Sequence, residues 1–168
     1  MSRALLRLAF CLTLAALIGG TSANAQNVRF SFGSSLQLDG SALEITADNF
    51  EVDQTSGAST FSGNVLAVQG RMRISAQSLR LEYAPGARAG TQRIGSLTAS
   101  GGVAMVTDTE AIEAQRAVYS IADQRLEMTG DVVLVQGINL LSGERFIADL
   151  RAGTGSMTGR VRTIIRME

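Results

Sequence analysis

A short motif that recurs in fixed phase constrains this chain more than any other feature of its sequence. The motif is an apolar residue, a small residue, a glycine, one further residue and a valine. Its copies are centred on Gly63, Gly101, Gly130 and Gly159. A second element precedes each copy and begins at Ile45, Ile74, Ile112 and Leu141. Repetition of this kind predicts a fold assembled from one supersecondary unit used four times.

The spacing between the two elements defines the repeat. The first residue of the second element precedes the motif glycine by 18 residues in the first, third and fourth copies, and by 27 in the second copy. The nine additional residues fall in the segment 84–92, whose proline and glycines indicate a loop insertion. From Gly101 onward the glycines recur every 29 residues. Two motifs in constant phase indicate a real repeat.

Within each unit the hydrophobic period is two residues. Met72 and Ile74 alternate with Arg71 and Arg73, and similar alternation follows at 79–83. This pattern is typical of strands with one buried face. A glycine inside such a strand usually marks a bulge or a sharp bend. We therefore expect an all-β domain of antiparallel strands, with a bend at each motif glycine.

The N-terminus predicts export. Arg3 and Arg7 precede an apolar run at 8–18, and Ala23-Asn24-Ala25 forms a small-x-small cleavage pattern. We expect a signal peptide at 1–25, cleaved after Ala25, and a mature domain at 26–168 in the periplasm. An uncleaved N-terminal anchor is the alternative, although the apolar run is short for a bilayer span.

The composition excludes several classes of function. Without Arg3 and Arg7 the chain has 13 basic and 15 acidic residues, so it lacks the basic surface that nucleic-acid binding requires. It has no histidine, and its single cysteine, Cys11, lies in the predicted signal peptide. The commonest general base, nucleophile and zinc ligands are therefore missing from the mature chain. We predict a binding protein with no catalytic residues, metal or cofactor.

The remaining carboxylates are interpreted as solvated. Asp48, Glu51 and Asp53 cluster in sequence, but Glu51 and Asp53 alternate with apolar residues and so point away from the buried face. The segment Thr107-Asp108-Thr109-Glu110 is typical of a polar turn between strands, again with solvent as the expected surrounding.

Parity and alignment between the copies predict which apolar side chains face inward. In the first half of the chain they are Leu43, Ile45, Phe50, Val52, Phe61, Val65, Ile74, Leu79 and Leu81. In the second half they are Ile112, Tyr119, Met128, Val132, Leu134, Phe146, Leu150 and Met157. The pattern alone favours an ordinary sealed core, because alternating strand faces are usually core.

The runs at 45–52 and 61–70, followed by Met128-Thr129-Gly130-Asp131-Val132 and 143–147, resemble the LptA/OstA-like family of periplasmic lipopolysaccharide transport bridge proteins. The resemblance covers roughly 36–165. It implies a slightly twisted, open β-jellyroll whose apolar interior binds the acyl chains of lipopolysaccharide. The inward residues would then line a lipid-binding groove, with Leu43 and Ile45 near its N-terminal edge.

The resemblance also implies partners. Members of the family stack head to tail between inner-membrane and outer-membrane components of the transport machinery. The unpaired edges would be formed by 34–45 and 157–166, since a free strand edge accepts another strand. The edge residues would be Leu36, Leu38, Arg160, Arg162 and Ile164. Two alternatives stay open: a membrane-attached adaptor of the same system, and a structural β-repeat protein with a sealed core.

Overall fold

The structure is a computed structural model, and it describes residues 41–84 and 93–166. Within these ranges every regular element is a strand, and no helix could cross a membrane. The predicted signal peptide and Leu36 and Leu38 lie outside the described residues. The strands are β1 (Leu43–Thr46), β2 (Asn49–Val52), β3 (Ser59–Gln69), β4 (Met72–Tyr83), β5 (Ile94–Val106), β6 (Glu110–Ser120), β7 (Arg125–Gln136), β8 (Asn139–Asp149), β9 (Thr154–Thr158) and β10 (Arg162–Ile164).

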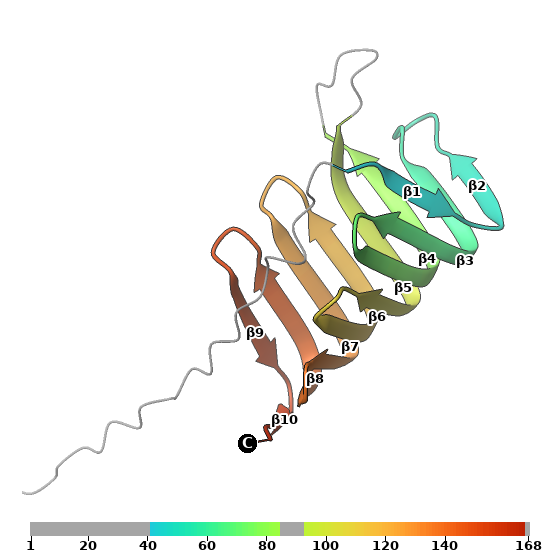
Figure 1. Ribbon diagram of the computed structural model, residues 1–168. Helices are drawn as coiled ribbons and strands as arrows, with labels where there is room; N and C mark the ends of the chain where they lie inside the picture. Colours follow the sequence, from blue (N-terminus) through green and yellow to red (C-terminus); the bar gives the residue numbers. More distant parts are fainter. Residues whose placement is uncertain (1–40, 85–92, 167–168) are drawn as a thin grey trace, which may run out of the picture.

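The strands form one antiparallel sheet in which each long strand pairs with the next one along the chain. The order is β1-β3-β4-β5-β6-β7-β8-β10, with β2 beside β3 and β9 beside β8. Figure 1 shows β1 and β2 at one end of this stack and β9 and β10 at the other. The all-β antiparallel architecture predicted from the repeat, and the open form implied by the family resemblance, are confirmed.

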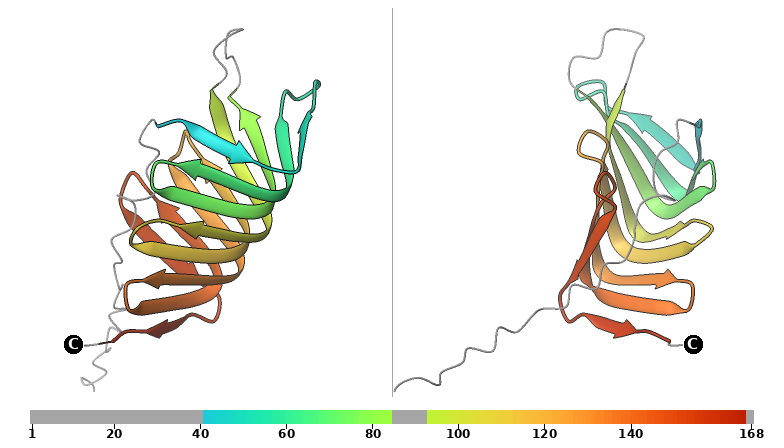
Figure 2. Two further views of the ribbon diagram at one scale, coloured as in Figure 1. Left: turned by 45° about the vertical axis from the view of Figure 1, so that its right-hand side comes forward. Right: turned by 60° about the vertical axis from the view of Figure 1, so that its left-hand side comes forward.

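Each long strand bends near its middle. The register of every pair from β3–β4 to β7–β8 shifts once at this level, for example between Ser62 and Val65 and between Thr129 and Val132. Gly63, Gly101 and Gly130 lie at these shifts, and Gly159 lies between β9 and β10. The residue after each also has positive φ; Gly130 and Asp131, for instance, have φ values of 85° and 47°. The bulges predicted from the motif are confirmed, and Figure 2 shows the resulting curvature of the strands.

The bends divide the sheet into two layers that face each other. Layer A contains β1, β10 and the strand halves 65–69, 72–76, 103–106, 110–114, 132–136 and 139–143. Layer B contains β2, β9 and the halves 59–62, 78–83, 94–100, 116–120, 125–129 and 145–149. The 18-residue spacing therefore covers one strand half in layer A and an antiparallel hairpin in layer B, and it ends at the bend where the chain returns to layer A.

The hydrophobic core lies next to the bends. Phe146, Leu79, Ile112, Met128 and Val132 are at most 2 % exposed and pack there from both layers. Side chains alternate between the two faces of a strand, so residues two apart share a face. The bend folds one half of that face onto the other, which brings these side chains together. The angle between the layers is thus filled by side chains.

Two expectations about local structure are wrong. Thr107 and Glu110 are only 9 % and 6 % exposed, whereas the segment was expected to be solvated. Glu110 starts β6 on its inner face, and the backbone N–H groups of Glu110 and Thr109 donate to the Thr107 hydroxyl. The last strand is also not continuous over 157–166. Gly159 and Arg160, with φ values of 79° and 40°, break it into β9 and β10.

Candidate functional site

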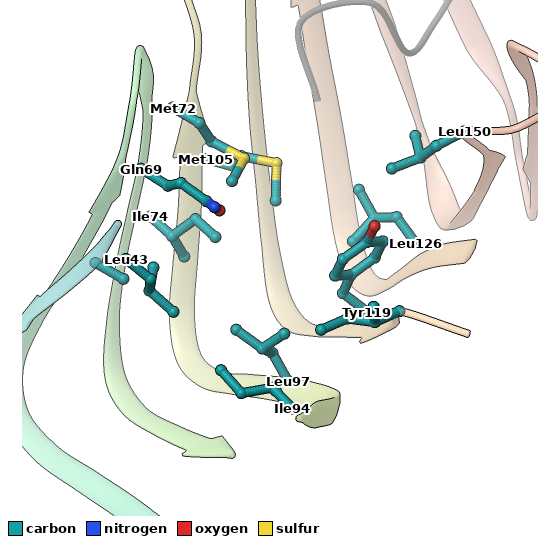
Figure 3. Close-up of a pocket in the computed structure, with 12 residues that line it drawn as sticks. Leu43, Gln69, Met72, Ile74, Ile94, Leu97, Met105, Tyr119, Leu126 and Leu150 are labelled. Carbon is teal, nitrogen blue, oxygen red and sulfur yellow. The ribbon is translucent and has the colours of Figure 1, made fainter. Parts of the chain in front are cut away.

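A cavity of about 110 Å³ lies between the two layers, on the side away from the bends. Layer A contributes Leu43, Ala67, Gln69, Met72, Ile74 and Met105 to its wall. Layer B and its loops contribute Ile94, Leu97, Tyr119, Ile121, Leu126 and Leu150. Figure 3 shows these side chains converging from both sides. We call the space between the layers, from the packed bend to this cavity, the groove.

The cavity wall is chemically simple. Gln69 and Tyr119 are the residues with polar side-chain groups among those that line it. Burial raises the pKa of the Tyr119 hydroxyl above its usual value, so this group stays neutral in the physiological range. Among the described residues no three histidine, cysteine or carboxylate side chains gather as a metal site would require. An apolar wall with neutral polar groups favours binding of an apolar ligand.

The register places the predicted inward residues on one face. Phe61 pairs with Phe50 and with Leu79, so all three project from the same side of layer B. Ile45 pairs with Ala67, whose other neighbour is Ile74, and these form the corresponding face of layer A. Phe50 and Val52 are 58 % and 52 % exposed because β2 is the end strand and lacks a further neighbour in the described structure.

The structure divides the other predicted inward residues into three groups. Leu43, Ile74, Tyr119 and Leu150 line the cavity. Eight others are buried core, namely Val65, Leu79, Leu81, Ile112, Met128, Val132, Leu134 and Phe146. Leu150 belongs both to this core and to the cavity wall. Ile45, Phe61 and Met157 pack partly buried against that core. The groove is thus sealed at the bend and open toward its mouth.

Sequence reasoning missed several lining residues. Ile94 and Ile121 lie at strand ends beside loops, where the alternation fades. Ala67 is small, and Gln69 is polar, so hydrophobic pattern alone does not select them. Their parity with Val65 on β3 is the signal that could have found both, because residues at even spacing on a strand share a face.

Two strand edges are unpaired in the described structure. β1 and β2 pair with β3, and β9 and β10 pair with β8, while their opposite sides meet no strand in the described parts of the chain. Arg162 and Ile164 lie on β10, as expected for edge residues. Arg160 lies in the bend instead, and its Nε is 3.2 Å from Glu144 Oε1. The two edges stand at opposite ends of the stack (Figure 1).

Charged side chains lie on the outer surface of the sheet. On layer B the Nε of Arg145 donates to Glu127 Oε1 at 2.9 Å, and this bond lowers the pKa of Glu127. Hydrogen bonds from Ser96 and Arg80 lower the pKa of Glu82 in the same way. These carboxylates are ionised at neutral pH and face solvent. The outer face of layer B is therefore polar where the groove is apolar.

Comparison with known proteins agrees with this architecture. No curated protein sequence matches the chain. Among solved structures, it resembles LptH, described as the LptA homologous periplasmic component of the conserved lipopolysaccharide transport device from Pseudomonas aeruginosa. The identity is 14 %, the TM-score is 0.66, and the match covers 76 % of this chain and 97 % of that one. At this identity the likeness establishes the fold.

A family profile carries the assignment further. The profile of the LptA/(LptD N-terminal domain) LPS transport proteins matches residues 44–154. This range begins in β1 and ends at the first residue of β9, so it includes all of the long bent strands. The resemblance that the repeat motifs indicated is confirmed. The chain belongs to the LptA/(LptD N-terminal domain) family of lipopolysaccharide transport proteins.

Proposed function

We propose that this protein is a periplasmic lipopolysaccharide carrier. It shields acyl chains in the groove between layers A and B and joins head to tail with further copies and with membrane components of the transport machinery. The observation that carries the proposal is the apolar cavity at the mouth of a two-layered sheet whose two ends meet no further strand among residues 41–84 and 93–166. Family membership and the predicted export signal support the same role.

The energetics of acyl chains require such a groove. Each methylene transferred from water to an apolar environment gains roughly 0.8 kcal/mol, so exposing a chain of about a dozen carbons costs on the order of 10 kcal/mol. Lipopolysaccharide carries several acyl chains. A wall of leucine, isoleucine and methionine side chains removes this cost along the path.

The size of the cavity implies that the layers separate when lipid enters. A void of about 110 Å³ is of the order of one that holds a benzene-sized ligand, so it admits part of an acyl chain. The side chains that must move apart are Tyr119 and Leu126 on one side and Met72 and Met105 on the other, because they flank the void. The bend supplies the fixed end about which the layers open.

Stacking follows from the unpaired edges. An exposed strand presents backbone N–H and C=O groups that accept a further strand. β1 and β10 both belong to layer A, and β2 and β9 both belong to layer B. Pairing of β9 and β10 with β2 and β1 of the next copy would continue each layer and keep the two grooves in line.

The carrier proposal can be tested by placing a charge on the inner or on the outer face of the same strand and comparing lipid binding. Ile74 lines the cavity, whereas its neighbour Ser75 is exposed on the outer face of layer A. We expect Ile74→Asp to weaken binding of purified lipopolysaccharide more than tenfold, because a carboxylate among acyl chains is unpaired, and Ser75→Asp to leave binding unchanged. Circular dichroism verifies that both variants fold. Equal binding by both would indicate a sealed core and contradict the proposal.

A further inference from the structure

The inner face of layer A ends in a row of polar side chains at the groove mouth. Glu110 on β6 pairs directly with Gln136 on β7, which pairs with Asn139 on β8. Gln69 occupies the corresponding inner position on β3, two residues beyond buried Ala67. We call these four residues the polar row. The facing mouth of layer B is apolar and includes Ile94, Ile121 and Leu150.

Two acceptor atoms in this row are buried without a partner. Gln69 Nε2 donates to the Ser41 carbonyl at 2.9 Å, and Gln136 Nε2 donates to Glu110 Oε1 at the same distance. Among the described residues, however, Gln69 Oε1 and Asn139 Oδ1 are both buried and accept no hydrogen bond. A buried acceptor without a donor is costly and calls for one. Figure 3 shows the Gln69 amide directed into the cavity.

We infer that the polar row binds the hydroxyl and amide N–H groups of a glycolipid at the junction between its sugars and its acyl chains. This inference rests on the proposed function and adds the orientation of the ligand. The two carboxamide oxygens accept these donors, and the acyl chains then lie against layer B. The row thereby makes the two walls of the groove chemically different.

The same row disfavours phosphate. A phosphate diester or ionised monoester offers acceptors, and the row presents acceptor oxygens from Gln69, Glu110 and Asn139. No arginine occupies an inner position of the row, since the nearby Arg71 and Arg73 are exposed. The phosphates of a bound glycolipid therefore face solvent. The protein selects for donor groups next to acyl chains rather than for negative charge.

The test compares three lipids on the purified protein, by displacement of a fluorescent fatty acid from the groove. The lipids are lipid A, dephosphorylated lipid A, and dimyristoyl phosphatidic acid, whose head group has no sugar hydroxyl and no amide N–H. We expect Gln69→Met and Asn139→Leu, which preserve side-chain size, each to weaken both forms of lipid A about three- to tenfold. Binding of phosphatidic acid should not weaken, which also shows that the groove of each variant is intact.

Gln54→Met is the matched control, because Gln54 is an exposed carboxamide in the β2–β3 turn. It should alter none of the three affinities. Unchanged lipid A binding in both row variants, or an equal loss for lipid A and phosphatidic acid, would overturn the inference and leave the carrier proposal standing. A wild-type protein that binds phosphatidic acid but neither form of lipid A would overturn both.

Discussion

Asp48 lies directly over Gly63. Its backbone N–H donates to the Gly63 carbonyl at 2.9 Å, and a Cβ on Gly63 would meet its carboxylate oxygen at 2.5 Å. Glu144 and Gly159 repeat the relationship, with a hydrogen bond of 3.1 Å. In the second and third units, the side chains of Gln77 and Gln115 take the same place over Gly101 and Gly130. In each unit, the space that a Cβ on the motif glycine would need is thus occupied by a side chain that comes just after the unit's first strand segment.

Replacement of Gly130 by alanine should destabilise the fold by about 2–4 kcal/mol, because left-handed backbone and overpacking act together. Gly130 has a φ of +85°, and an added Cβ would lie 2.7 Å from the Cβ of Gln115. Urea denaturation of the variant measures the loss.

Gly137→Ala is the matched control, since Gly137 has a φ of +57° and open space around its Cβ position. It should cost about 1–2 kcal/mol through the backbone alone. If the two variants lose the same stability, the packing of Gln115 does not restrict position 130.

Phe146→Ala should remove about 3–5 kcal/mol of stability, because Phe146 is 1 % exposed in the core beside the bend. Leu43→Ala should cost roughly 1 kcal/mol or less, since Leu43 is partly exposed and lines a cavity that already exists. Thermal unfolding compares the two. Similar losses would show that the packed bend and the open mouth are not distinct.

Acid should weaken the outer face of layer B. The hydrogen bond from Arg145 lowers the pKa of Glu127 in the folded protein, so its ionised form favours folding. This contribution is present at neutral pH and is lost as the pH falls through the lowered pKa, below the usual carboxyl range. Glu127→Gln should therefore be slightly less stable than the wild type at pH 7. The difference should shrink as the pH falls through that range, and a difference that grows in acid would contradict the assigned bond.

Proline substitutions at two neighbouring positions of β10 distinguish the role of this strand in folding from its role in self-association. Consecutive residues of a strand direct their N–H groups to opposite sides, so one of Thr163→Pro and Ile164→Pro removes a bond to β8 and the other removes a donor on the free edge. We expect one variant to lose stability and the other to lose self-association while it keeps its melting temperature and lipid binding. Analytical ultracentrifugation provides the association readout. If neither variant changes self-association, β10 is not the interface.

Much of this fold could be predicted because its information is local and repeated. The motif at Gly63 needs positive φ and space for Asp48, and the same need recurs in each unit, so its phase alone defines the bent hairpin. Parity placed Ile74 and Tyr119 on the inner face in the same way. Family resemblance, and not periodicity, supplied the lipid.

The division of the inner face into core and groove could not be predicted. Met128 and Ile74 both project from the inner face of their strands, yet Met128 is fully buried and Ile74 lines the cavity. The distinction depends on distance from the bend and on how far the two layers diverge, which are tertiary properties. Glu110 was expected to face solvent for a related reason: its burial depends on contacts with Thr107 and with Gln136 of the next strand.

The most direct test of the carrier is site-specific photo-crosslinking in cells. A photoreactive residue at Ile45 or Tyr119, on the inner faces of layers A and B, should form adducts with lipopolysaccharide. The same residue at Glu51 or Glu113, both exposed on outer faces, should form none. Adducts at the outer positions, with none at the inner ones, would contradict transport of lipid through the groove.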